Sequence, residues 1–234
     1  LDNKNKDFFF FEKKDVRSVM GALVYLVKTR LPEYIGASPF EIQVLTPMRK
    51  GELGVEHLNE VLQYYLNPAS ESKKEKEGRT GVFREGDKVM QVKNNYKLEW
   101  KITNAKGFSI EEGLGVFNGD MGIIKQINTY SERITVVFDE NREAEYPFSS
   151  LDELELAYAI TIHKSQGSEY PAVVLPLLSG PPILCNRNLL YTAITRAQKC
   201  VAIAGRQSMV EQMIHNETEQ KRYSGLNDCL KEGL

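Results

Sequence analysis

The sequence contains few cysteines and no cysteine spacing typical of a structural site. Its three cysteines, Cys185, Cys200 and Cys229, cannot all pair with one another, and none forms a C-x-x-C motif. Disulfide frameworks and structural zinc sites depend on such pairs and spacings. We therefore expect a reducing, cytoplasmic setting and no metal site in this chain.

Long apolar runs and a signal peptide are also missing. The first apolar run covers only residues 8–11, far short of the roughly 20 residues that a membrane span requires. The chain starts at Leu1 with a charged lead-in and no initiator Met. These features exclude a transmembrane protein or a membrane partner, and they favour a processed protein or a piece of a longer one.

Charge of one sign does not dominate. The 234 residues include 30 Lys and Arg against 32 Asp and Glu, a net charge of −2, so no overall field attracts a polyanion. Residues 73–106 are an exception, with ten basic and five acidic side chains. This stretch predicts a local nucleic-acid contact, and a solvated loop is the alternative.

The first part of the chain alternates strands and helices. A strand is expected at residues 8–11, followed by a helix that Asp15 caps and Pro32 ends. The apolar positions of that helix lie on one face: Val16, Met20, Leu23 and Val27. A second strand at 42–45 and a second helix at 55–65 repeat the pattern.

The middle of the chain has a different pattern. Residues 67–81 have almost no apolar side chains and predict a mobile linker or loop. Residues 83–150 contain short runs broken by Gly, Asn and Asp, which predict a small antiparallel β module. Within it, residues 96–113 receive no assignment.

Strand and helix alternation returns after this module. Strands are expected at 156–162, 172–175 and 200–204, with helices near 188–197 and 207–214. Alternation on both sides of an all-β segment indicates an α/β domain with a parallel sheet and an inserted β module.

The densest polar cluster, residues 161–169, directly follows a buried-looking strand. Ligands of open α/β sheets bind beyond the carboxyl ends of strands, and Thr, Ser, His and Lys can donate to phosphate oxygens. The alternative is a helix start capped by Ser165 or Ser168. A hydrolase is disfavoured because no G-x-S-x-G elbow is present.

Two further clusters contain basic residues. Residues 188–197 predict a helix with Arg196 at its polar edge, where a planar donor fork suits phosphate, although a surface ion pair is the alternative. Residues 45–55 place Arg49 and Lys50 between a strand and a helix N-terminus, which attracts anions. A plain connecting loop is the alternative there.

In this order the clusters resemble the RecD-like helicases of superfamily 1, which move 5′ to 3′ on single-stranded DNA. Residues 46–55, 161–169 and 190–197 are similar to motifs IV, V and VI of that family. Residues 86–96 and 116–122 are similar to the segments that open and enter its SH3-like barrel.

The resemblance implies an α/β fold with a RecA-like, P-loop NTPase-type parallel sheet and an inserted antiparallel SH3-like β-barrel. Residues 1–82 and 151–234 would form the second RecA-like domain, and residues 83–150 the inserted barrel. The implied function is the C-terminal motor module of an ATP-dependent DNA helicase, of the exodeoxyribonuclease V alpha-subunit type, in recombination and repair.

The sequence has no G-x-x-x-x-G-K-[ST] phosphate loop and no acidic strand of the Walker B kind. ATP and Mg²⁺ would therefore bind mainly to the N-terminal RecA-like domain of the parent protein, and this chain alone would be inactive. Single-stranded DNA, that N-terminal domain and other recombination or repair proteins are the implied partners.

The resemblance also implies roles for single residues. Arg196 would act as an arginine finger on the nucleotide and Arg49 as a second contact. Nucleotide-sensing positions would be Gln166, Gly167, Glu169 and Lys50. DNA-facing positions would be Thr161, His163, Lys164, Asn94, Asn95 and Asn118. Whether Arg49 or Lys50 faces the nucleotide stays open, as does the role of residues 97–112.

Two other functions are compatible with the sequence. One is a stand-alone nucleic-acid-binding module that uses the β module and residues 73–106 without ATP. The other is an SH3-like adaptor that binds a protein partner, with the α/β part as scaffold.

Overall fold

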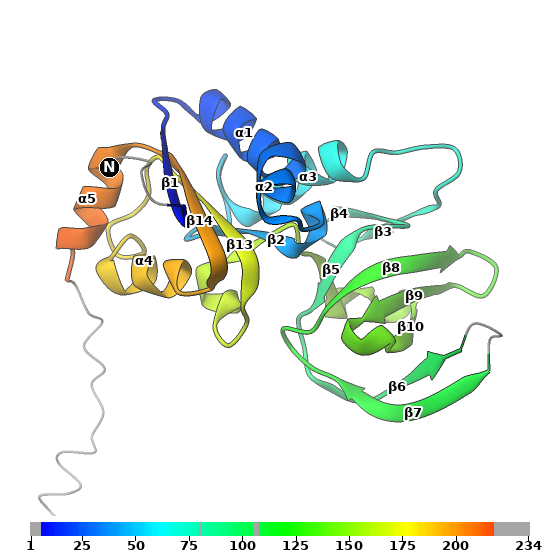
Figure 1. Ribbon diagram of the computed structural model, residues 1–234. Helices are drawn as coiled ribbons and strands as arrows, with labels where there is room; N and C mark the ends of the chain where they lie inside the picture. Colours follow the sequence, from blue (N-terminus) through cyan, green and yellow to red (C-terminus); the bar gives the residue numbers. More distant parts are fainter. Residues whose placement is uncertain (1–5, 80, 105–107, 218–234) are drawn as a thin grey trace, which may run out of the picture.

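The computed structural model describes residues 6–79, 81–104 and 108–217, and Cys229 lies outside these ranges. It contains a five-stranded parallel sheet, a seven-stranded antiparallel sheet and a two-stranded hairpin (Figure 1). Within the same ranges, none of the helices is long and apolar enough to cross a membrane.

The parallel sheet is built from both ends of the chain. Its strands, in spatial order, are β1 (Phe8–Glu12), β14 (Ala197–Gly205), β13 (Tyr170–Leu177), β2 (Ile42–Thr46) and β12 (Ala159–Thr161). Every neighbouring pair is parallel. The central strands are apolar runs because both faces of a parallel sheet are covered. The predicted α/β class is confirmed.

Helices cover the two faces of this sheet. One face packs on α1 (Val16–Tyr25), α2 (Leu31–Ile35) and α3 (Val55–Leu66), and the other on α4 (Arg187–Ile194) and α5 (Gln207–His215). Strand side chains alternate between the two cores, since Val44 belongs to the first and Leu45 to the second. The helices thus fix the loops at both edges of the sheet.

The predicted end of the first helix is wrong. Asp15 caps α1 as expected, accepting a hydrogen bond from the Ser18 N–H at 2.9 Å. Pro32 does not stop the helix, because a π-helical turn (Leu26–Arg30) precedes it and Pro32 sits in the first turn of α2, where no N–H is needed. The helix ends instead at Gly36, in the left-handed region at φ 65°.

The predicted β module is an antiparallel sheet. Its strands, in spatial order, are β11 (Leu154–Leu156), β5 (Lys88–Gln91), β8 (Met121–Asn128), β9 (Arg133–Phe138), β10 (Glu143–Pro147), β6 (Asn95–Thr103) and β7 (Ser109–Val116). The stretch 96–113, which has no assignment from sequence, forms most of β6 and β7. This sheet includes β11, which lies beyond residue 150. The domain limits 1–82, 83–150 and 151–234 stay a prediction.

Two other segments differ from expectation. The expected linker at 67–81 contains β3 (Glu75–Gly78), which pairs with β4 (Gly81–Arg84). The single strand expected at 156–162 is wrong, because β11 belongs to the antiparallel sheet and β12 to the parallel one. The chain crosses between the two sheets at Ala157 and Tyr158.

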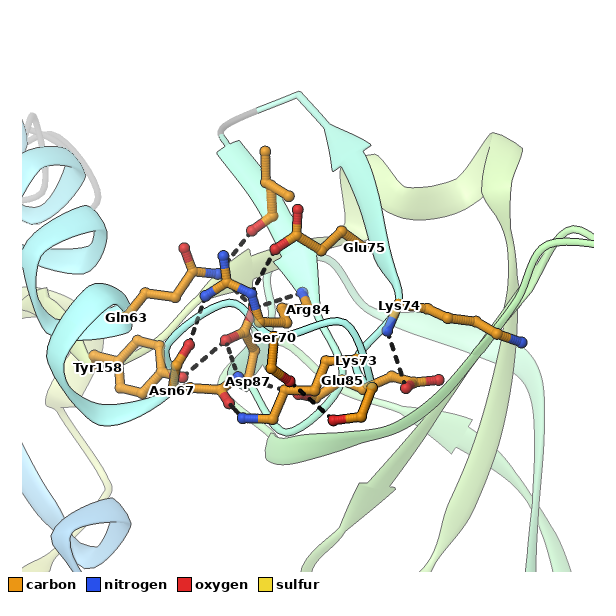
Figure 2. Close-up of polar contacts among 12 residues, drawn as sticks. Gln63, Asn67, Ser70, Lys73, Lys74, Glu75, Arg84, Glu85, Asp87 and Tyr158 are labelled. Atoms are coloured by element: carbon orange, nitrogen blue, oxygen red, sulfur yellow. Dashed lines mark hydrogen bonds and ion pairs between the residues drawn. The ribbon is translucent and has the colours of Figure 1, made fainter.

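A buried carboxylate holds this junction together (Figure 2). Asp87 is fully buried and accepts hydrogen bonds from Gln63 at 2.6 Å, Asn67 at 2.7 Å and the Tyr158 hydroxyl at 2.9 Å. The Arg84 backbone N–H donates to it as well, at 2.6 Å. Burial raises the pKa of Asp87. These bonds connect α3, β4 and the crossing segment, so they fix the β module against the parallel sheet.

Candidate nucleotide and nucleic-acid site

Two of the three predicted clusters begin at the same edge of the parallel sheet. β2 and β12 are neighbours, and Thr46 lies opposite Thr161 in the register. Arg49 and Lys50 follow β2, and the 3₁₀ turn Ile162–Ser165 follows β12. The carboxyl ends of these strands therefore place the 45–55 and 161–169 clusters side by side.

The 3₁₀ turn presents polar side chains to solvent. Thr161 caps it by accepting the Lys164 N–H at 3.3 Å, so the alternative of a helix start capped by Ser165 or Ser168 does not apply to this turn. Ser165 is buried and donates to the Ile162 carbonyl at 2.7 Å, which tightens the turn. His163 is exposed on it, and Gln166, also exposed, follows its last residue and begins the segment that leads to β13.

One carboxylate holds the two basic side chains of this edge. Glu155, on β11, contacts Arg49 Nη2 at 2.6 Å and Lys164 Nζ at 3.0 Å. Burial acts to raise the pKa of Glu155, but the hydrogen bonds from both cations outweigh it, so the pKa is lowered. The bond to Glu155 in turn raises the pKa of Arg49. Glu155 was missed by the sequence-based assignment, because its partner Arg49 lies 106 positions away.

Arg196 lies at the other edge, just before the amino end of β14. Its guanidinium donates to the Thr192 carbonyl at 3.3 Å, the Ser168 carbonyl at 3.2 Å and the Thr195 hydroxyl at 3.3 Å. Arg196 forms no ion pair with any residue in the described ranges. Its side chain is therefore oriented by neutral groups, and no carboxylate of the described residues pairs with it.

Gly167 and Glu169 lie next to Arg196. They belong to the segment that ends at the start of β13, and the Tyr170 N–H donates to the Arg196 carbonyl at 2.8 Å. Glu169 is exposed and accepts a bond from Gln198 at 3.3 Å. Lys50, by contrast, is exposed in the loop beside Arg49 at the opposite edge. The predicted nucleotide residues thus form two groups.

The predicted DNA residues of the β module come together in part. The Asn118 N–H donates to Asn94 Oδ1 at 2.9 Å, so the loops after β5 and β7 are joined. Asn95 points elsewhere, since its amide donates to Glu153 at 2.9 Å. Asn94 and Asn118 therefore form one exposed group. The Asn95 side chain is held by Glu153 and does not belong to this group.

An aromatic pair beside this group was also missed by the sequence-based assignment. The rings of Tyr96 and Phe117 meet edge to face, 5.6 Å apart, and remain 68% and 42% exposed. Gly115 makes room for the Phe117 ring, because a Cβ there would lie 2.9 Å from it. The only sequence signal for this pair was the alternation of polar and aromatic residues, which does not predict which rings are exposed to solvent.

The described part of the chain offers these groups no candidate metal centre. Residues 6–79, 81–104 and 108–217 contain no cluster of three or more His, Cys, Asp or Glu side chains that could hold an ion. The chemistry that the arrangement offers is cationic and hydrogen-bonding, which suits phosphate oxygens.

Two family models match the chain. The SH3 domain of ATP-dependent RecD-like DNA helicases matches residues 58–138. The UvrD-like helicase C-terminal domain matches residues 156–204. The first match covers most of the antiparallel sheet, and the second covers the 161–169 and 188–197 clusters.

Curated proteins of the same kind are similar to much of this chain. The ATP-dependent RecD2 DNA helicase of Deinococcus radiodurans is 39% identical over 167 residues, which are 71% of this chain and 20% of that protein. The RecBCD enzyme subunit RecD of Mycolicibacterium smegmatis is 30% identical over 191 residues, 82% of this chain and 29% of that protein. The chain spans less than a third of either relative.

Among solved structures, a Pif1 helicase from Bacteroides in complex with ADP-AlF3 and ssDNA aligns with 92% of this chain and 53% of that chain, at 16% identity and a TM-score of 0.45. The family models and the curated relatives carry the assignment. The resemblance predicted from the motifs is confirmed: the chain carries the SH3 domain of the RecD-like helicases together with a UvrD-like helicase C-terminal domain.

Proposed function

We propose that this chain is the C-terminal motor module of an ATP-dependent 5′ to 3′ DNA helicase that acts in recombination and repair. The observation that carries the proposal is Arg196, whose guanidinium is hydrogen-bonded to three neutral oxygens and has no carboxylate partner in the described ranges, within a UvrD-like helicase match. The proposal includes a cytoplasmic location and partners among recombination proteins, because one relative is named as a subunit of the RecBCD enzyme.

The amino edge of the sheet would serve the nucleotide. ATP and Mg²⁺, held mainly by the N-terminal RecA-like domain of the parent, supply the transferable phosphoryl group and its metal. The part of this chain is to neutralise charge that develops on the γ-phosphate, which Arg196 suits because its charge is not compensated. Gln166, Gly167 and Glu169 would line the same side. With no P-loop in its sequence, the chain alone would not hydrolyse ATP.

The carboxyl edge and the β module would bind single-stranded DNA. Thr161, His163 and Lys164 offer donors to backbone phosphates. The exposed rings of Tyr96 and Phe117, beside Asn94 and Asn118, offer surfaces on which bases stack. None of these contacts reads a base edge, so we expect little sequence preference.

One segment connects the two edges. Residues 161–169 start at the carboxyl end of β12, where His163 and Lys164 lie, and end beside Arg196, to which the Ser168 carbonyl is bonded. Closure of a nucleotide cleft on Arg196 would therefore pull directly on the DNA side. This segment is the proposed coupling between ATP hydrolysis and stepping.

Fluorescence anisotropy with a labelled oligothymidylate tests the DNA part. His163→Ala should weaken binding several-fold, because an exposed donor at the strand end is lost. The matched control is Lys74→Gln with Lys76→Gln, on the β3 hairpin, which should change binding less and only through a nonspecific, salt-sensitive contribution. The reverse ranking would place the DNA path along the hairpin and contradict the proposal.

Nucleic-acid binding without ATP is the second candidate function, and the Tyr96 and Phe117 pair favours it. The two functions differ in one measurement. The motor module should restore ATP hydrolysis to a P-loop-bearing domain of its parent, whereas a stand-alone binding module should not.

A further inference from the structure

The ion pair around Glu155 lies in a solvent-open pocket at the junction of the two sheets. The pocket has a volume of about 600 Å³. Its charged lining comprises four cations and three carboxylates: Arg49, Arg79, Lys93, Lys164, Glu56, Asp152 and Glu155. The pocket therefore remains cationic even with every carboxylate in place.

Glu155 occupies the centre of this charge distribution. Its side chain is only 19% exposed, and its two oxygens are divided, one to Arg49 and the other to Lys164. The other two carboxylates are more exposed, at 44% for Glu56 and 42% for Asp152. Glu56 reaches only Arg49, at 3.4 Å, and Asp152 pairs with Lys93. Among the described lining residues, Glu155 is thus the carboxylate whose two oxygens each form an ion pair with a different cation.

The pocket also lies between the two groups proposed to face DNA. Lys93, on its wall, precedes Asn94 in the β module, and Lys164 belongs to the 3₁₀ turn with His163. A DNA strand that contacts both groups would pass this pocket.

We propose that Arg49 and Lys164 form a phosphate-binding site and that Glu155 is its internal occupant, which an incoming phosphate displaces. The inference rests on the proposed function and adds a regulatory carboxylate to it. Glu155 keeps the two cations together until the ligand arrives, and its release is part of binding.

The exchange is chemically matched. A carboxylate and a phosphate present similar acceptor oxygens to a guanidinium fork and an ammonium group, and the phosphate carries more oxygens and equal or greater charge. The solvent-open pocket lets Glu155 move into water when it is released. Both a DNA backbone phosphodiester and a nucleotide phosphate have this chemistry.

The test compares the 234-residue chain with its Glu155→Gln variant, which keeps the side-chain shape and removes the competing charge. Affinities for labelled oligothymidylate and for ATP are measured separately. We expect binding of at least one probe to tighten roughly three- to tenfold, the range of a partly screened ion pair. Tightening with oligothymidylate alone identifies the DNA backbone as the source, and tightening with ATP alone identifies the nucleotide.

Two variants serve as controls. Asp152→Asn removes the same charge from the same pocket, and Glu56→Gln removes the second contact of Arg49; both should change affinity by less than about twofold. Equal tightening by Asp152→Asn would attribute the effect to overall charge and overturn the inference. Arg49→Gln added to Glu155→Gln should abolish the gain.

The failures of the two proposals are distinguishable. If the wild-type chain binds a probe and Glu155→Gln binds it equally well or more weakly, the displacement is wrong and the proposed function is unaffected. No binding of either probe by either form overturns both the displacement and the DNA role. If the variant misfolds, the wild-type Arg49 Nη–H and Lys164 Nζ–H resonances decide, because Glu155 contacts these two groups and its displacement requires both to shift when the probe is added.

Discussion

Arg196 and Arg49 are both arginines predicted to contact nucleotide, yet their surroundings are opposite. Arg196 is held by two backbone carbonyls and a hydroxyl. Arg49 is held by two carboxylates, Glu155 at 2.6 Å and Glu56 at 3.4 Å. Neutral partners orient an arginine and leave its charge available to an anion. Carboxylate partners compete with an anion and must be displaced before it can bind. Under the proposed function, Arg196 is therefore a ready arginine at one edge of the sheet and Arg49 an occupied arginine at the other.

The largest expected effect follows from the ready arginine. In a protein that contains this chain and a P-loop domain, Arg196→Ala should reduce DNA-stimulated ATP hydrolysis by about 10³ or more, the low end of what arginine fingers contribute. Arg196→Lys should not restore the rate, because an ammonium cannot form the planar fork. DNA affinity, measured in parallel, should hardly change. Retention of most of the rate by Arg196→Lys would remove the distinction between the two arginines.

The second effect concerns Lys88, a residue of β5 that connects the antiparallel sheet to the parallel-sheet part of the chain. Lys88 is buried and donates to the Phe40 carbonyl at 2.7 Å and to Gln43 at 2.8 Å. Burial lowers its pKa to about 7, although the charges of Asp139 and Glu41 oppose this shift.

Because the ordinary lysine pKa of 10.5 applies to the unfolded chain, the unfolded state binds more protons between about pH 7 and 10.5, and stability rises with pH across that window. Lys88→Met should remove a rise on the order of 3 kcal/mol. Urea unfolding of both forms at pH 6 and pH 9 measures the difference. Parallel pH dependence in the two forms would exclude a buried, perturbed Lys88.

A third, smaller effect is expected on the β module. Tyr96→Ala should weaken single-stranded DNA binding about tenfold, since a stacked base contributes about 1–3 kcal/mol. Tyr130→Ala is a matched control, because Tyr130 is 99% exposed but lies in the turn between β8 and β9, away from the Asn94 and Asn118 group. Equal losses in both variants would argue against a stacking surface at Tyr96.

The smallest effect should come from the occupied arginine. Arg49→Gln should lower DNA-stimulated ATP hydrolysis only about two- to fivefold, because part of its interaction energy is already taken by Glu155 and Glu56. A loss as large as that of Arg196→Ala would mean that Glu155 leaves Arg49 at no measurable cost, and the contrast between the two edges would then be lost.

Much of the fold could be predicted from the sequence because its signals are local. Four elements are each predicted from their own residues alone. The signals are the Asp15 cap, the apolar runs at 42–45 and 200–204, and the helical spacing after residue 55. Where several signals coincide, as around 161–169, the position of a site is predicted as well.

The errors occur where distant contacts decide. Ala157 and Tyr158 are buried like the strands around them, so no local signal marks the crossing from β11 to β12. The hairpin at 75–84 is polar in composition but is fixed by the Asp87 network, whose members lie as far apart as Gln63 and Tyr158. Glu155 is an ordinary acidic residue in sequence, and it acquires its role only from two cations that the fold brings to it.

The most direct test of the account is ATP hydrolysis by the purified chain, alone and mixed with the P-loop-bearing domain that the proposed function assigns to its parent protein. We predict no turnover by the chain alone and DNA-stimulated turnover in the mixture, which Arg196→Ala abolishes and Arg49→Gln only lowers. Turnover by the isolated chain, or a mixture that is indifferent to Arg196→Ala, would contradict the claim that this chain supplies the arginine half of a composite ATP site.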